Sequence, residues 1–215
     1  YVVGGNALIS RFIGQGRKRR ASSLLYALGI FAIILSVFVT IGGYIGSEKF
    51  YIWMGSEPEV VAQGKLYFQI LSLGIVFIFL DSLLYNALSA AGDTSSSLYI
   101  KLVSAGLNAF LNYVFIFGHF GCDAMGIEGA AYATVISYMF SIFVYILLLR
   151  LRSSKLHLIP IVRIKDLKRV WSVGYSAALD RGISSVSFLV FVSIITAYGT
   201  AELAGYQVGL RIEGI

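Results

Sequence analysis

Five long apolar segments, separated by short polar loops, constrain this chain more than any other feature of its sequence. Each has about 20 residues or more, the length at which a helix crosses a hydrocarbon layer of ~30 Å. The pattern therefore predicts an all-α, polytopic membrane helix bundle. The predicted spans are Leu24–Ile45, Leu66–Ala91, Leu98–Phe117, Ala130–Leu149 and Trp171–Tyr198.

Basic residues collect in alternate loops. Twelve of the 17 Lys and Arg residues lie either between Arg11 and Arg20 or between Arg150 and Arg169, with Asp166 as the one acid there. Loops rich in Lys and Arg stay on the cytoplasmic side. The two basic loops are therefore predicted to be cytoplasmic, and the loops that carry Glu57 and Cys122 external, in the cytoplasmic (inner) membrane.

Composition supports this interpretation. Hydrophobic residues make up 58% of the chain and charged residues 13%, whereas soluble domains have about 45–50% and about 25%. The net charge of +6 raises the question of nucleic acid, but basic residues beside membrane spans orient the helices and meet anionic lipid head groups. No nucleic-acid partner is predicted. The single cysteine, Cys122, excludes a disulfide within the chain.

The ends of the sequence and its longest basic loop carry further expectations. Tyr1–Ile13 and the segment that opens at Ala201 are both too short to span a membrane, so we expect part of the machinery to lie outside this chain. The basic loop contains Pro160 and is typical of a boundary between two parts of a bundle. Within it, Leu156–Val162 suits an amphipathic surface helix or a strand, and the pattern does not choose between them.

Four of the predicted spans each carry one polar stripe at helical spacing. These stripes favour either packing between helices, for which Ser, Thr and Asn are suited, or a shared water-filled cavity. The serines favour packing. Asp81 and Asp180 favour the cavity, because a carboxylate gains little from packing alone; Arg181, next to Asp180, is expected to snorkel toward the cytoplasmic surface. The stripes are Asp81, Tyr85 and Ser89; Lys101, Ser104, Asn108 and Asn112; Thr134, Ser137 and Ser141; and Ser176, Asp180, Ser184 and Ser187.

No catalytic constellation is present in the sequence. The two histidines, His119 and His157, fall in loops predicted to lie on opposite sides of the membrane, so they cannot share a metal ion. There is no phosphate-binding loop of the P-loop form, and the spans contain no paired aspartates or Ser/His arrangement. We therefore expect a protein that is not an enzyme and that holds no metal. A receptor or scaffold role would leave Asp81 and Asp180 without a purpose.

Six local strings resemble, in the same order, segments of the multidrug and toxic compound extrusion (MATE) family. They are Arg11–Arg17, Met54–Val60, Ala87–Thr94, Asn108–Gly118, Gly126–Thr134 and the stretch from Gly199 to Ile212. The resemblance implies a twelve-helix exporter of two six-helix lobes, of which this chain holds the end of helix two to the start of helix eight. The implied division is an N-lobe over 1–150, an inter-lobe loop over 151–170 and the start of the C-lobe over 171–215.

Members of that family exchange cationic or amphipathic compounds for H⁺ or Na⁺, so the resemblance implies an ion-coupled secondary exporter, monomeric when full length, without a cofactor beyond the coupling ion. Asn108 and Thr134 match residues of the family's N-lobe cation site. Asn112 stands where some members have an aspartate, which leaves ligation by an amide oxygen but excludes proton carriage by this residue. Asp81, Tyr85, Asp180 and Ser184 are the candidates for the cavity that receives substrate.

A flippase for lipid-linked oligosaccharides, from the same superfamily, is the alternative. Such a protein handles pyrophosphate lipids and is expected to line its cavity with several basic residues. Lys101 and Arg181 are the only basic residues within the predicted spans. This scarcity favours a cation exporter.

Overall fold

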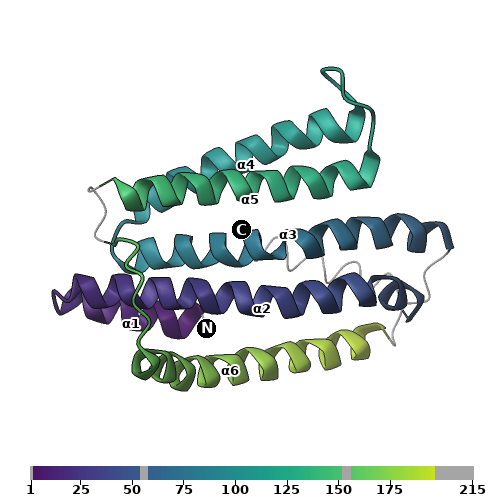
Figure 1. Cartoon of the computed structure of the whole chain (residues 1–215). Coiled ribbons are helices and arrows are strands. Elements are labelled where there is room, and N and C mark those ends of the chain that lie inside the picture. Colours follow the sequence, from purple (N-terminus) through teal and green to yellow (C-terminus); the bar gives the residue numbers. More distant parts are fainter. Residues whose placement is uncertain (1, 54–57, 152–155, 197–215) are drawn as a thin grey trace.

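The computed structural model describes residues 2–53, 58–151 and 156–196, and all regular structure in these ranges is helical. Helices α1 to α5 each run antiparallel to the next one along the chain, and α6 follows them (Figure 1). Helices α4 and α5 lie side by side, α3 packs against α5 and α2, and α1 packs against α2 and α6. The helices are α1 (Val2–Gly14), α2 (Lys18–Trp53), α3 (Pro58–Ala90), α4 (Thr94–Phe117), α5 (Gly126–Arg150) and α6 (Ile164–Thr196).

Among the described residues, four helices are long and apolar enough to cross a membrane: α2, α3, α4 and α5. They contain the first four predicted spans, each of which lies within its helix to within one residue. Helix α1, with 13 residues, is shorter than a span, as its sequence predicts. The fifth predicted span is helical as far as Thr196, and its described part is not among the helices found long and apolar enough to span a membrane.

The turns between helices use residues suited to them. Asp93 caps the N-terminus of α4, where its Oδ1 accepts from the Ser96 N–H at 3.2 Å, as a capping aspartate should. Gly118 ends the same helix with φ of 74°, a left-handed conformation that glycine adopts at low cost. These two ends fix the length of α4 and hence the depth of the polar side chains that it carries.

The buried core is concentrated near the end of the bundle where α1 ends and α2 begins. Leu8, Ile9 and Phe12 of α1 meet Leu25 and Leu28 of α2 there. The core continues through Leu83, Leu88, Tyr145 and Leu149. In contrast, large apolar side chains such as Leu102, Val103 and Phe143 are exposed on the outer faces of α4 and α5. Exposed apolar faces of this kind are what a lipid environment permits and water does not.

Small residues allow α5 to approach its two partners closely. A Cβ atom at Gly129 would lie 2.7 Å from the backbone of Phe115 on α4, and one at Gly74 of α3 would lie 2.3 Å from Val135 Cγ2 on α5. Helices in membranes associate through such close contacts, since lipid supplies no hydrophobic drive between them. The resulting α3–α4–α5 unit holds the polar stripes in a fixed register.

The loop before α6 corrects one sequence expectation. Residues 156–163 form neither a helix nor a strand. Pro160 cannot donate a backbone hydrogen bond, and the loop is instead held by α2: the His157 N–H donates to Ser22 Oγ at 3.0 Å, and Ser23 Oγ donates to the Ile161 carbonyl at 2.6 Å. Leu156 is fully buried in the core cluster. The loop is therefore docked onto the bundle by backbone contacts rather than by an amphipathic face.

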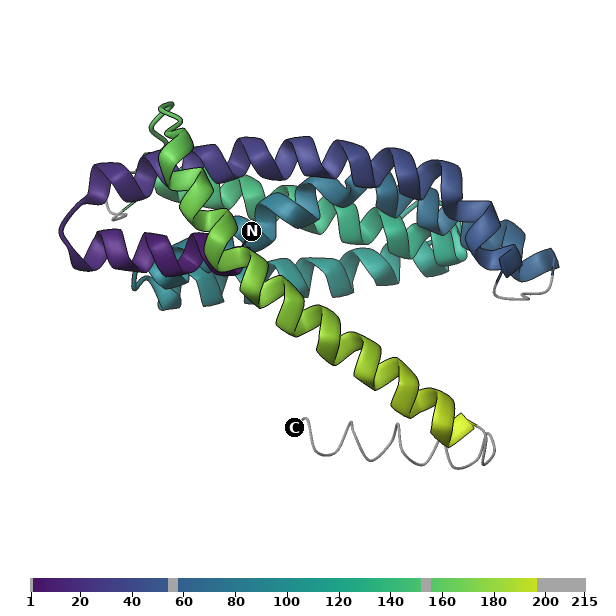
Figure 2. The same ribbon diagram turned by 90° about the horizontal axis from the view of Figure 1, so that it is seen from below.

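Helix α6 begins against the bundle and then leaves it. Its first turns contact α1, where Gly4 is so close to the Val170 carbonyl that a Cβ atom would lie 2.4 Å from it. Figure 2 shows α6 crossing the other helices at a steep angle, with its C-terminal half away from them. Side chains such as Tyr175, Ile183 and Phe188 are consequently exposed along its length.

Candidate functional site

A buried ion pair links helices α3 and α4 in the middle of the bundle. Asp81 of α3 is 1% exposed, and its Oδ2 accepts from the Lys101 ammonium of α4. Its Oδ1 accepts from the Ser141 hydroxyl of α5. Three helices thus each supply one member of the cluster. Because a carboxylate without partners is expensive in an apolar interior, this pairing explains how Asp81 can occupy the position.

Lys101 is further enclosed by two aromatic rings. Its Nζ lies 5.7 Å from the ring centroid of Tyr85 and 5.2 Å from that of Tyr138. Ammonium groups are attracted to aromatic faces at such distances. The side chain is nevertheless 34% exposed, so the ammonium compensates Asp81 on one side and remains open to a cavity on the other.

The antiparallel hairpin of α3 and α4 brings this pair to one depth. Asp81 lies ten residues before Ala91 in the connecting turn, and Lys101 lies ten residues after it. At 1.5 Å per residue, Asp81 stands ~14 Å from Ala90, where α3 ends, and Lys101 ~11 Å from Thr94, where α4 begins. With the turn at the edge of a ~30 Å hydrocarbon layer, both residues would lie well inside that layer.

A second polar cluster links α4 to α5. Asn112 Nδ2 donates to Asn108 Oδ1 at 3.0 Å, and Asn108 Nδ2 donates to Thr134 Oγ1 at 3.5 Å. Thr134 in turn donates to the Ala130 carbonyl at 2.8 Å. The chain of hydrogen bonds leaves Asn112 Oδ1 buried and without a donor. An unsatisfied buried acceptor calls for an explanation, and a bound cation would supply one.

A cavity of about 200 Å³ connects the two clusters. Its walls come from one face of α4 and one face of α5. Lys101 is the one charged residue among its described lining residues. The lining is Lys101, Ser104, Ala105, Asn108, Thr134, Ser137 and Tyr138. The two serines bind backbone rather than the cavity: Ser104 Oγ donates to the Ser137 carbonyl at 2.9 Å, and Ser137 Oγ to the Ala133 carbonyl at 2.7 Å.

The structure brings some of the predicted site residues together and separates others. Asn108, Asn112 and Thr134 form one hydrogen-bonded group, and Tyr85 joins the Asp81 cluster through Lys101. Asp81 itself does not line the cavity, because Lys101 stands in front of it. Its place is therefore that of a compensated carboxylate behind the wall, rather than the free cavity carboxylate that the sequence suggests.

Asp180 and Ser184 stand apart from both clusters. They lie on α6, where each is exposed, and the described part of α6 contacts only α1 and α2. Within the described residues, no group of three or more His, Cys, Asp or Glu side chains is placed to hold a metal ion. His119 stacks on Tyr113, with ring centroids 4.3 Å apart, at the other end of the bundle from the loop of His157.

Sequence reasoning missed two partners of Asp81. Lys101 is visible in the sequence as part of a polar stripe, but a search for a partner at i+3 or i+4 on the same helix cannot find it. The useful signal is the similar distance of the two residues from the turn at 91–93: Asp81 lies ten residues before it and Lys101 eight residues after it. Ser141 belongs to a stripe as well, yet only the packing of α3 against α5 shows that it reaches Asp81.

Comparisons with known proteins agree on one family. The MatE family profile matches residues 2–114, more than half of the chain. The chain is 27% identical over 219 residues to "Probable multidrug resistance protein NorM" of Thermotoga maritima, covering 99% of this chain and 46% of the relative. It is 29% identical over 212 residues to "Probable multidrug resistance protein YoeA" of Bacillus subtilis, covering 95% and 46%. The chain thus spans about half the length of the curated relatives it matches.

Solved structures share the fold. A transporter of the MOP superfamily from Pyrococcus furiosus, described as having a binding pocket of reversed polarity, matches with a TM-score of 0.86 and 26% identity over 99% of this chain and 47% of that one. An outward-facing MATE transporter matches with a TM-score of 0.83, and an inward-facing one with 0.79, each at 25% identity over at least 98% of this chain and 47–48% of the other. Together with the four membrane-length helices, these matches show that this chain belongs to the MatE family of multi-pass membrane transporters.

Proposed function

We propose that this chain is part of an ion-coupled secondary exporter that moves cationic or amphipathic compounds in exchange for Na⁺ or H⁺. The observation that carries the proposal is the hydrogen-bonded group of Asn108, Asn112 and Thr134, with its unpartnered acceptor at Asn112 Oδ1. Oxygen atoms of amides and hydroxyls are ligands for hard cations. Polar side chains inside the membrane-spanning helices of a protein often mark ion or solute pathways.

Alternating access is supported by the relatives. Solved members of the family adopt inward-facing and outward-facing conformations, and the curated relatives are described as multidrug resistance proteins. In exporters of this kind, the binding site stays near the middle of the membrane while the lobes rock around it. We assign residues 1–150 to one lobe and residues from 171 to the start of the other, with the docked loop between them.

Transport by the full-length protein in sealed proteoliposomes tests the coupling site. Asn108→Ala removes the amide that joins Asn112 to Thr134, and is expected to weaken efflux of a fluorescent cation driven by a Na⁺ or H⁺ gradient at least tenfold. Asn86→Ala is the matched control, because Asn86 Nδ2 donates to the Ser82 carbonyl of its own helix and lies outside the cavity lining. Unchanged efflux and ion dependence in Asn108→Ala would assign the asparagines to helix packing.

Asp180 is proposed as a second functional carboxylate, with Ser184 one helical turn further along α6. It is exposed and therefore free to face a cavity that further helices complete. Asp180→Asn separates two roles: loss of coupling with every substrate indicates proton carriage, whereas weaker affinity for cations alone indicates attraction of substrate. Normal transport of cationic and neutral substrates by Asp180→Asn would remove both roles.

One observation favours a flippase for lipid-linked oligosaccharides as the second candidate. Lys101 is the one charged residue on the described cavity wall, and an ammonium is suited to a phosphate or pyrophosphate group. Lys101→Met distinguishes the two functions in the full-length protein. A flippase should lose movement of a pyrophosphate-linked lipid, whereas an exporter should retain selectivity for cationic compounds over anionic ones.

A further inference from the structure

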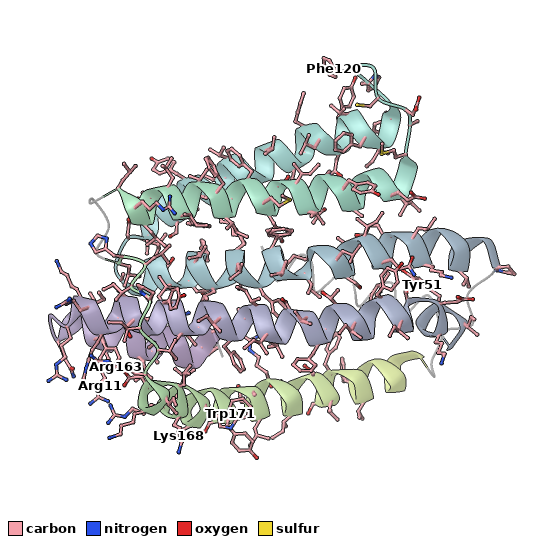
Figure 3. All side chains as sticks on the ribbon, viewed as in Figure 1. Arg11, Tyr51, Phe120, Arg163, Lys168 and Trp171 are labelled. Atoms are coloured by element: carbon pink, nitrogen blue, oxygen red, sulfur yellow. The ribbon has the colours of Figure 1, made fainter. Side chains whose placement is uncertain are left out.

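Two segments far apart in the sequence form a basic cavity at the end of the bundle predicted to be cytoplasmic. The cavity measures about 550 Å³ and lies between the start of α2 and the loop before α6. Its described lining consists of Gly16, Arg17, Lys18, Arg19, Arg20 and Arg163. Figure 3 shows Arg163 at the same end of the molecule as Arg11, Lys168 and Trp171, whereas Tyr51 and Phe120 lie at the other end.

Within the part of the chain that the structure describes, no carboxylate forms an ion pair with the charges in this basic cavity. Among the described residues, the ion pairs are Lys65–Glu48 and Lys101–Asp81, and neither involves a residue of the cavity. The one acid nearby is Asp166, which lines an adjoining cavity of about 300 Å³ with Arg20, Arg163 and Lys165. Five like charges around one space repel each other, and the N-terminus of α2 adds the positive end of a helix dipole. A bound anion would reduce the repulsion among these charges and would also interact favourably with the helix N-terminus.

An apolar cavity of about 420 Å³ continues from this basic region between α2 and α6. The three spaces share residues: Arg20 and Arg163 line both basic cavities, and Ile164 lines the adjoining basic cavity and the apolar one. Leu28 and Phe31 form the α2 side of the apolar cavity, and Trp171 and Tyr175 belong to its α6 side. Aromatic residues of this type sit at the level of lipid head groups.

The combination of an uncompensated basic space and an adjoining apolar groove fits one class of ligand. We propose that this region binds an anionic phospholipid of the cytoplasmic leaflet, with its phosphate in the basic cavity and an acyl chain between α2 and α6. Basic pockets between membrane helices on the cytoplasmic side are suited to such head groups. A soluble phosphate would use the basic cavity alone and would leave the apolar groove without a role.

Native mass spectrometry of the detergent-purified full-length protein tests this site. Phosphatidylglycerol, phosphatidylcholine of the same chain length and free glycerol phosphate are added separately, and bound molecules are counted. Phosphatidylglycerol is expected to bind at least tenfold more tightly than either of the others. Equal binding of phosphatidylcholine, or equal binding of glycerol phosphate, would overturn the proposal, and neither comparison depends on a variant.

Variants then locate the binding. Arg163→Gln and Arg20→Gln are each expected to weaken phosphatidylglycerol binding about fivefold, the effect expected of one basic residue near a lipid phosphate. Arg11→Gln is the matched control, since Arg11 is exposed at the same end of the molecule but lines neither basic cavity. Equal losses in all three variants would show a diffuse surface charge effect and reject a defined site.

Discussion

Asp81 depends on Lys101 more than Lys101 depends on Asp81, because the carboxylate is 1% exposed and the ammonium 34%. Removing one partner of a buried pair strands the other charge, at a cost of ~3–5 kcal/mol. Lys101→Met is therefore expected to lower the melting temperature more than Asp81→Asn, whose stranded ammonium still reaches the cavity. The double variant should recover part of the loss. Thermal unfolding of the purified protein measures all three.

The exposed pair Lys65–Glu48 provides the comparison for that experiment. Its side chains are 39% and 52% exposed, and exposed ion pairs contribute little to stability. Glu48→Gln is expected to leave the melting temperature nearly unchanged. If Lys101→Met were tolerated as well as Glu48→Gln, the pair in the middle of the bundle would have no structural role.

Asn112 offers a gain-of-function test at the same scale. Its Oδ1 is buried and unpartnered; Asn112→Asp would keep this oxygen and replace the NH2 group, which donates to Asn108 Oδ1, by a second carboxylate oxygen. A negative charge beside Asn108 and Thr134 should strengthen Na⁺ binding by about tenfold or more at neutral pH, as charge on a ligand does for cations. Isothermal titration with NaCl measures the affinity, with Asn86→Asp as the control. Unchanged affinity would place the cation elsewhere.

Single residues also mark the limit of prediction from this sequence. Asn108 and Asn112 are foreseen on one face of a helix by their i,i+4 spacing, and Thr134 is grouped with them through the resemblance to the MATE family. The partner of Asp81 is not foreseen, since it lies on another helix and depends on the register of the hairpin. Asp81 does not line the described cavity, and the sequence cannot show this because periodicity gives the face of a residue but not what stands in front of it.

Among the helices, close contact between α4 and α5 determines the geometry of the cavity. Gly129→Val would place side-chain atoms against the Phe115 backbone, which cannot move as a flexible side chain can. We expect a loss of ~1–3 kcal/mol from overpacking, seen as a lower melting temperature. Gly106→Ala in α4 is the control: it meets nothing within 4 Å, and it should be neutral or stabilise by ~0.5–1 kcal/mol through helix propensity.

Docking of the 156–163 loop onto α2 can be tested by proteolysis. Ser22→Ala and Ser23→Ala together remove the hydrogen bonds to His157 N–H and the Ile161 carbonyl, each worth ~1 kcal/mol. Trypsin cleavage at Arg163 should then be several-fold faster in the purified full-length protein. Ser10→Ala is the control, because Ser10 bonds only to Ala7 of its own helix. An unchanged rate of cleavage would mean that burial of Leu156 alone holds the loop.

The helices themselves are largely predictable, since hydropathy and length alone locate α2 to α5. The loop before α6 is not, because its conformation rests on hydrogen bonds to Ser22 and Ser23, more than 130 residues earlier in the chain. The mostly apolar stretch Leu156–Val162 therefore misleads toward an amphipathic helix or a strand. Local sequence patterns predict local structure, whereas the conformation of this loop is determined by its contacts with the distant helix α2.

For the whole molecule, the predicted orientation rests on charge, and the structure groups the same charges at one end. Cys122, partly exposed in the loop between α4 and α5, supplies a native label at the other end. An impermeant thiol reagent should modify Cys122 in the full-length protein of intact cells stripped of any outer membrane, but not in sealed inverted vesicles. Cys122→Ser is the control for background. The reverse pattern of labelling would invert the topology.

Helix α6 touches α1 at Gly4, where Val170 and Gly174 lie against it, and continues to Thr196. The 22 residues after Gly174 make, at 1.5 Å per residue, an arm of roughly 33 Å. A tilt of about 10° at the Gly4 contact would therefore carry the far end sideways by roughly 6 Å, about one helical turn. Because Gly4 and Gly174 carry no side chains to obstruct such a tilt, a small local displacement at this contact would become a large one across the thickness of the membrane.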